Sequence, residues 1–244
     1  MELRGRTALV TGAGHRVGRA LALALGRAGM RVGVHYNAAH HEARETLAQL
    51  EAEGCEGGAI FGADLTEPDA PARLISEIAA QFGTLDVLVN SAAVMRRTPF
   101  GAVTPSEWDA IMSLNLRAPF FLAQAAAPHL RRAKGVIINI ADLAAFETWP
   151  GYIPHGISKS GVVHLTRALA AVLAPEVRVA GIAPGTVLLP EGWSDADDEH
   201  LRKTTPLRRH GDPSDVAATM LFLLQSDYIT GETIIVDGGR HVRR

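Results

Sequence analysis

The sequence predicts an α/β fold: one doubly wound, seven-stranded parallel sheet with helices on both faces. Short apolar runs alternate along the chain with longer segments of helical periodicity. The short runs are continuously apolar, which is typical of parallel strands buried on both faces. The 244 residues suffice for one sizeable core, and no repeat, low-complexity tract or linker divides them. We therefore expect residues 1–244 to form a single domain.

Strands and helices are predicted to follow one another along the chain. The seven strand-like runs are TALVTG, RVGVHY, GAIFGADL, DVLVNSA, GVIINIA, VRVAGIAP and TIIVDGG. Helix starts and apolar periodicity predict helices at 16–28, 39–53, 69–82, 106–130, 153–174 and 213–225. Pro119 and Pro128 are expected to kink or shorten the fourth helix, because proline removes a helical hydrogen bond.

The acidic stretch 188–207, LLPEGWSDADDEHLRKTTPL, follows the end of the sixth predicted strand. Loops in this position often close over a ligand, so we predict a mobile substrate lid that contains a short helix. A solvated loop is the alternative.

Composition limits the partners and the location. The net charge of −2 gives no electrostatic reason to expect a nucleic acid or a membrane surface, so a small-molecule substrate is the expected partner. Cys55 is the single cysteine and cannot form an internal disulfide. The charged start MELRGR lacks the apolar stretch of a signal peptide, and no run approaches the ~20 apolar residues that span a bilayer. We therefore expect a cytoplasmic protein without a transmembrane helix.

The segment TGAGHRVG, residues 11–18, follows the first predicted strand and opens the first predicted helix. Gly12, Gly14 and Gly18 allow the backbone to turn tightly, to approach a pyrophosphate and to pack helix against strand, and the helix N-terminus supplies amide donors. This context predicts a Rossmann-type dinucleotide site, whereas the glycines alone also fit a plain tight turn.

The end of the second predicted strand indicates which dinucleotide binds. An NAD site usually has an acidic residue there, about 20 residues after the glycine loop, to hold the ribose 2′-hydroxyl. This chain instead reads HYNAAHH, without an acid. Arg16 could pair with a 2′-phosphate, and Asn37 or His40 could add donors. The sequence therefore predicts NADP(H), unless Arg16 is only a solvated surface residue.

The chain resembles the short-chain dehydrogenase/reductase family from end to end. The segments that carry the resemblance are TGAGHRVG, ADL at 63–65, NSAA at 90–93, SLNLRAPF, ISK at 157–159, RVAGIAPG at 178–185 and YITGETIIVDGG at 228–239. Within the family the chain is most similar to the pteridine reductases. They share the arginine in the glycine loop, the HY that ends the second strand, and an Asp rather than a Ser after the fifth strand.

The resemblance implies a cofactor site. Its residues are Gly12, Gly14, His15, Arg16, Val17, Gly18, Tyr36, Asn37, Asp64, Leu65, Asn90, Ala92, Lys159, Pro184, Gly185 and Thr186. Asp64 and Leu65 would flank the adenine. Asn90 and Ala92 would flank the ribose side. The 184–186 turn would flank the nicotinamide, unless that turn merely ends a strand. Lys159 would hold the nicotinamide ribose.

The candidate catalytic set is Asp142, His155, Lys159 and Asn115, and the resemblance implies the roles of Lys159 and Asn115. Asn115 would anchor a water in a proton relay toward Lys159, or alternatively satisfy a kinked helix. The pteridine reductases place an aromatic residue near Met95 that stacks on the pterin, but this chain has no aromatic residue between Asn90 and Phe100. The Met95 thioether could pack on a flat ring instead.

His155 is the largest departure, because the family has a tyrosine at this position of GYIPHGISK. A positioned proton donor lowers the barrier to hydride transfer. The Lys159 ammonium disfavours a charged imidazole, whereas Asp142, at the predicted end of the fifth strand, favours it. An imidazole nitrogen also ends roughly 2 Å short of a tyrosine oxygen. Tyr152, one turn earlier, matches a tyrosine that is not catalytic in the pteridine reductases.

These features predict an NADPH-dependent reductase that transfers hydride to a C=N or C=O bond of a small, flat substrate. The alternatives are slow catalysis without a dedicated acid and a non-catalytic NADP(H)-binding protein. The resemblance further implies a homotetramer that pairs the helices at 106–130 and 153–174. The other histidines, including His40, His41 and His210, lack metal-ligand spacing, so we expect no metal site.

Overall fold

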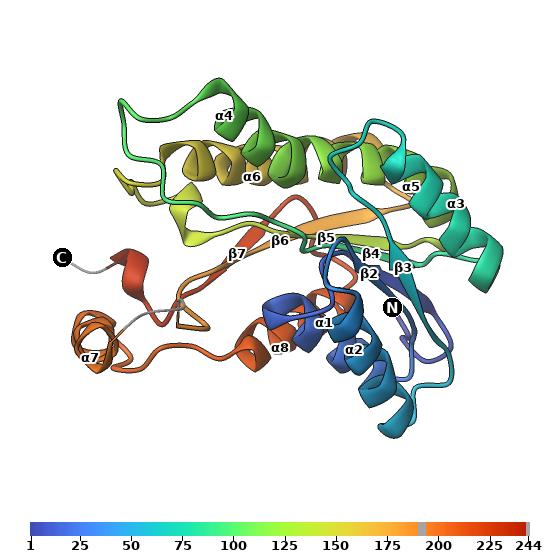
Figure 1. Ribbon diagram of the computed structural model, residues 1–244. Coiled ribbons are helices and arrows are strands. Elements are labelled where there is room, and N and C mark those ends of the chain that lie inside the picture. The colour runs from blue at the N-terminus through green and yellow to red at the C-terminus, as the bar shows by residue number, and fades with distance from the viewer. Residues whose placement is uncertain (190–193, 243–244) are drawn as a thin grey trace.

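A seven-stranded sheet forms the centre of the computed structural model, which describes residues 1–189 and 194–242 (Figure 1). The strands are β1 Thr7–Val10, β2 Arg31–Tyr36, β3 Gly58–Gly62, β4 Val87–Asn90, β5 Val136–Ile140, β6 Arg178–Pro184 and β7 Thr233–Val236. Their order is β3-β2-β1-β4-β5-β6-β7, and all neighbours are parallel. The order reverses between β1 and β4, which in doubly wound sheets is where ligands bind. The predicted fold class is confirmed.

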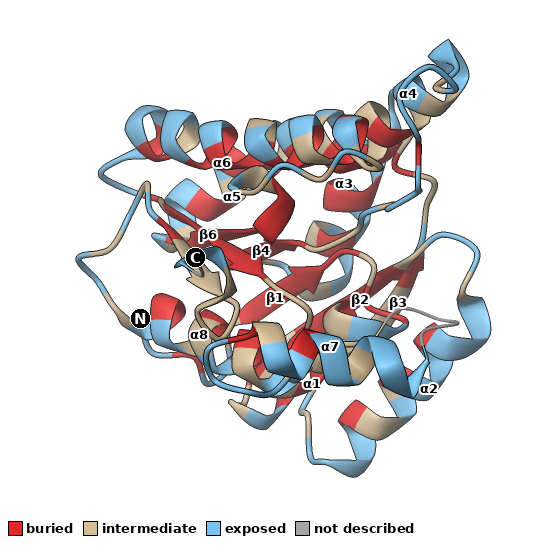
Figure 2. Cartoon of the chain, turned by 90° about the vertical axis from the view of Figure 1, so that its left-hand side faces the viewer, coloured by how far each residue is buried: buried red, intermediate tan, exposed pale blue. Residues whose placement is uncertain are grey.

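Helices cover both faces of the sheet (Figure 1). On one face lie α1 Arg16–Arg27, α2 His40–Ala52 and α8 Pro213–Gln225, and α1 contacts both of the others. On the opposite face lie α3 Ala70–Phe82, α5 Ala118–Ala133 and α6 Ile153–Leu173, with α5 packed between its two neighbours. Figure 2 shows that the central strands are almost wholly buried and that the helices expose their outer sides, whereas the edge strands β3 and β7 are only partly buried. This burial explains why the strand sequences are continuously apolar.

The predicted helix at 106–130 is interrupted. The chain forms α4 Pro105–Met112, then a π turn at Ser113–Arg117, then α5. In a continuous α-helix the nitrogen of Pro119 would have to donate to the carbonyl of Asn115, and proline has no N–H. The π turn, with its wider hydrogen-bond spacing, ends two residues before that proline. Pro128, in contrast, lies inside α5 without ending it.

Within the predicted lid, α7 Asp195–Thr204 supplies the short helix. Ser194 caps it: the Ser194 hydroxyl accepts a hydrogen bond from the Asp197 amide, and the Asp197 carboxylate accepts one from the Ser194 amide. Residues 190–193 of the lid lie outside the described residues, and its mobility stays a prediction. In the described part of the chain, no helix has both the length and the apolar character needed to cross a bilayer.

Candidate functional site

A cavity of about 860 Å³ opens beyond the carboxyl ends of the strands. Its lining includes every residue of the predicted cofactor and catalytic sets except Asn90 and Asn115. Segments that follow β1, β2, β3, β4, β5 and β6 all contribute to its walls. The size is within the range typical of small-molecule sites, ~300–1,000 Å³.

The glycine loop is shaped for close approach. Gly12 has a φ of +66°, and a Cβ at this position would lie 2.9 Å from the Cα of Ala92. A Cβ on Gly18 would collide with the carbonyl of Gly12. His15, at the start of α1, makes no side-chain capping hydrogen bond. The first amides of this helix therefore keep their capacity to bind an anion such as a pyrophosphate.

The loop is held by His35, a residue missed at the sequence level. The Gly12 amide donates to Nδ1 of His35 at 3.1 Å, so the ring proton is on Nε2, which lies 3.0 Å from the Ala63 carbonyl. Burial lowers the pKa of His35 to about 4, which keeps the ring neutral. The signal was present, because the HY pattern was noticed, but only Tyr36 was assigned to the site.

Arg16 lines the cavity and has a φ of +53°, a left-handed conformation that favours glycine. Asn37 also lines it, whereas His40 packs edge-to-face against Tyr36 at 5.3 Å and is absent from the lining. Asp64 lies at the adenine end that the family implies. Hydrogen bonds from the hydroxyl and amide of Thr66 lower the pKa of Asp64, so its side chain stabilises the turn after β3.

Asn90 was assigned to the ribose side, but its side chain lies elsewhere. Its amide nitrogen donates to Oδ1 of Asn139 at 2.8 Å, and Asn139 in turn donates to Thr166. This buried chain links β4, β5 and α6, because side chains on one face of neighbouring strands meet each other. The lining residues at this point are Ser91 and Ala92, whose amides both donate to the Thr11 hydroxyl.

The Asn115 side chain forms hydrogen bonds with backbone groups. Its side-chain oxygen accepts from the Val94 amide at 2.8 Å, and its nitrogen donates to the Val94 carbonyl at 2.9 Å and to the Ser158 hydroxyl at 3.1 Å. Asn115 belongs to the π turn, so the departure from α-helical geometry places this amide. It thereby fixes the segment after β4 next to α6.

Lys159 is buried, and its Nζ donates to the Ile140 carbonyl at 2.9 Å. Burial lowers the pKa of Lys159 from 10.5 to about 8, and the Asp142 carboxylate opposes this shift. The ammonium is therefore held at the end of β5 at a pKa unusually close to neutrality for a lysine.

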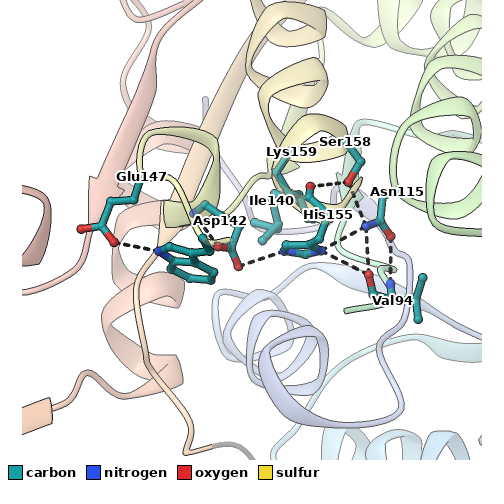
Figure 3. Close-up of polar contacts among 10 residues, drawn as sticks. Val94, Asn115, Ile140, Asp142, Glu147, His155, Ser158 and Lys159 are labelled. Carbon is teal, nitrogen blue, oxygen red and sulfur yellow. Dashed lines mark hydrogen bonds and ion pairs between the residues drawn. The ribbon is translucent and has the colours of Figure 1, made fainter. Parts of the chain in front are cut away.

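His155 lies between two hydrogen-bond acceptors (Figure 3). Its Nδ1 is 3.3 Å from the Val94 carbonyl, and its Nε2 is 3.6 Å from Oδ2 of Asp142. Asn115 lies 3.4 Å from Nδ1, but both of its amide hydrogens have shorter partners. Each ring nitrogen of His155 therefore faces an oxygen that can accept a hydrogen bond.

Access to the cavity differs between the two residues of this pair. The His155 side chain is 2% exposed and its Nε2 is buried without a hydrogen-bond partner, whereas the Asp142 side chain is 25% exposed. Oδ1 of Asp142 accepts from the Ala144 amide at 2.7 Å, which fixes the carboxylate at the start of a 3-10 turn. Both residues line the cavity, and the carboxylate is the more accessible of the two.

Comparison with known proteins identifies the family. A family model described as Enoyl-(Acyl carrier protein) reductase matches residues 12–241. The chain belongs to the short-chain dehydrogenase/reductase family. This family of oxidoreductases is the one that the sequence motifs indicated.

Relatives and a solved structure agree with this assignment. The chain is 35% identical over 243 residues to 3-oxoacyl-(acyl-carrier-protein) reductase FabG of Staphylococcus aureus (strain Mu50 / ATCC 700699), covering 97% of this chain and 98% of FabG. It is 32% identical over 255 residues to versicolorin reductase 1 of Aspergillus parasiticus, covering 98% and 97%. A crystal structure from Sinorhizobium meliloti 1021, assigned as a short-chain alcohol dehydrogenase, superposes with a TM-score of 0.93 at 36% identity, covering 100% and 99%.

Proposed function

We propose that this short-chain oxidoreductase is an NADPH-dependent reductase of a C=O or C=N bond in a small, flat substrate, with a His155–Asp142 pair as its proton source. The observation that carries the proposal is the position of His155: Nε2 faces the Asp142 carboxylate at 3.6 Å, and Lys159 lies one turn further along α6. A ligand-binding module would have no need of two buried ionisable groups beside a carboxylate, because buried charge is costly.

The residues present fit an NADP(H) cofactor. Gly12 and Gly18 allow close backbone approach, the start of α1 is uncapped, and Arg16 lines the same cavity as these amides. When bound, NADPH supplies the hydride. Lys159 would hold the nicotinamide ribose, and Arg16 would pair with the 2′-phosphate.

The proton is proposed to reach the substrate through Asp142. His155 lines the cavity, but its Nε2 is buried and faces the more exposed Asp142 carboxylate. As hydride reaches the carbon of the C=O or C=N bond, the π electron pair moves to the oxygen or nitrogen. The proton on His155 Nε2 moves to the Asp142 carboxylate, and Asp142 passes it to that oxygen or nitrogen. This leaves Asp142 as a carboxylate again and His155 neutral, and solvent restores the His155 proton after product release. Hydrogen bonds that are long in a ligand-free site commonly shorten during catalysis, so 3.6 Å is compatible with this transfer.

Two roles of Asp142 can be separated by the pH dependence of NADPH oxidation. If Asp142 only favours the charged form of His155, Asp142→Asn should regain activity near pH 5, where imidazole is protonated without help. If Asp142 carries the proton, Asp142→Asn should stay inactive at every pH, and formate should partly rescue Asp142→Ala. Glu53→Gln is the control, because this carboxylate pairs with Arg27 and does not line the cavity. Recovery of Asp142→Asn at low pH would contradict the proposed proton path.

A non-catalytic NADP(H)-binding protein is the second candidate, and the observation that favours it is that the His155 side chain is only 2% exposed and its Nε2 is buried. Tight NADPH binding without oxidation on a panel of dihydropteridines, quinones and activated ketones would support it. Turnover that disappears in both Asp142→Asn and Lys159→Ala would support the reductase.

The same panel addresses the substrate class. The names of FabG and versicolorin reductase 1 favour a carbonyl substrate, whereas Arg16, the HY ending of β2 and Asp142 support the pteridine reductase branch. We propose in addition a cytoplasmic homotetramer. Exposed aromatic residues on α4 and α5, among them Trp108, support this assembly. Light scattering that reported a monomer at micromolar concentration would exclude the tetramer.

A further inference from the structure

The segment between Asp142 and α6 forms one wall of the cavity. Trp149, Gly151 and Tyr152 all line it. The wall is fixed at two points: the Tyr152 amide donates to the Trp149 carbonyl at 2.9 Å, and the Thr98 amide donates to the Gly151 carbonyl at 2.8 Å. The second bond ties this segment to the chain that follows β4. Trp149 thus lies in a segment that two backbone hydrogen bonds hold in place.

The indole of Trp149 is itself oriented by two contacts. Its Nε1–H donates to Oε2 of Glu147 at 2.9 Å, and its ring meets that of Tyr152 at 6.2 Å and 77°. In Figure 3, Glu147, Asp142 and His155 follow one another, so the carboxylate that binds the indole is on the opposite side of Asp142 from the imidazole. Because Glu147 already satisfies the only polar atom of the indole, a ligand can contact Trp149 through its apolar surface alone.

We propose that Trp149 is the substrate-specificity residue of this site, and that it selects ligands with a flat conjugated ring by stacking against them. The inference rests on the proposed function, because it places the reducible bond beside Asp142. It also accounts for the missing aromatic residue near Met95: the chain supplies the ring from the segment after β5 rather than from the segment after β4. Met95, 49% exposed, lines the same cavity and adds a polarisable thioether.

A matched pair of ketones tests the proposal without turnover. The probes are 1-tetralone and trans-1-decalone, which share one bicyclic ketone skeleton but differ in the flat aromatic ring. Dissociation constants are measured by calorimetry on the whole protein saturated with NADP⁺, which cannot reduce them. We expect the wild-type protein to bind 1-tetralone more tightly, by about threefold to tenfold, as stacked aromatic pairs do.

Three variants assign that preference to the indole. Trp149→Ala should abolish the discrimination between the ketones, while Trp149→Phe should keep most of it. Phe146→Ala is the control, since Phe146 is an aromatic residue of the same segment but is 45% exposed and does not line the cavity. In a Trp108→Phe/Trp193→Phe background, which leaves Trp149 as the only tryptophan, 1-tetralone should also quench the fluorescence.

Equal binding of the two ketones by the wild-type protein would overturn the inference. So would an equal weakening of both by Trp149→Ala, or a loss of discrimination in Phe146→Ala. These outcomes are independent of the proposed reductase activity. Stacking without turnover would support Trp149 as the specificity residue and contradict the proposed function. Turnover without discrimination between the ketones would support the proposed function and contradict the role of Trp149.

Discussion

Lys159 is predicted to destabilise the folded protein at neutral pH. Its ammonium is buried, and burial lowers its pKa from 10.5 to about 8. At about 1.4 kcal/mol per pH unit, this lowering corresponds to roughly 3 kcal/mol of unfolding free energy. Lys159→Met removes this cost but also leaves the Ile140 carbonyl without its donor, a loss of ~1 kcal/mol. We expect the cofactor-free variant to be more stable than the wild type by ~2 kcal/mol at pH 7.

The pH dependence follows from the direction of the shift. Below about pH 8 the lysine is charged in both the folded and the unfolded states, and the folded state has the full cost. Between about 8 and 10.5 the folded state loses the proton first, so the unfolded state binds more protons and the free energy of unfolding rises with pH. The advantage of Lys159→Met should therefore shrink across this window.

The assay is urea unfolding followed by circular dichroism, at fixed protein concentration, at about pH 7 and pH 10. Lys203→Met is the matched control, because Lys203 is exposed and its ion pair with Glu199 on α7 contributes little. A Lys159→Met variant no more stable than the wild type at pH 7 would refute the reasoning. An advantage unchanged at pH 10 would do so as well.

Three further predictions concern the cofactor loop and the acid. Wild-type protein should bind NADPH at least tenfold (~1.4 kcal/mol) more tightly than NADH. Arg16→Gly should remove this preference in calorimetry and raise the melting temperature, since glycine suits the φ of +53°. An unchanged preference in this variant would exclude a phosphate-binding role for Arg16. As the pH falls from 6.5 toward 4, the wild type should lose stability that His35→Gln retains, because only the unfolded His35 binds a proton in this window; parallel urea-unfolding curves would contradict this. His155→Tyr should lower kcat on the true substrate, because the tyrosine replaces a working acid; a rise of ~10²–10⁴-fold would instead show a degraded site.

The sheet and most helices could be predicted because burial on both faces leaves a plain apolar signal in each strand. The interruption at Ser113–Arg117 could not, since a π turn differs from an α-helix in its hydrogen-bond spacing and has no distinct apolar period. Pro119 indicated a disturbance, but not its form. The motif positions predicted that Asp142 lies beside His155, and the two side chains are 3.6 Å apart and line the same cavity as the glycine loop.

Side-chain direction was the part that the motifs could not supply. Asn90 belongs to the NSAA motif, but its side chain forms a hydrogen bond within the sheet. Alternate residues of a strand face opposite sides, and Asn139 on the neighbouring strand lies on the same side as Asn90. His35 and Trp149 were missed for different reasons. The partner of His35, Gly12, is distant in the sequence, and the partner of Trp149, Glu147, belongs to no motif.

The position of the Asn115 side chain depends on the number of residues in the π turn. A π turn holds one residue more than the α turn it replaces, so deleting a residue next to Asn115 from Ser113–Arg117 would replace the π turn by an α turn and redirect the Asn115 side chain. The amide of Asn115 would then leave the Val94 backbone, and the carbonyl that faces His155 would lose its support. Point substitutions on the outer surface of α4 and α5 should be tolerated far more readily than this shortening. The number of residues in this turn, and not only their chemical identities, therefore determines where the Asn115 side chain lies.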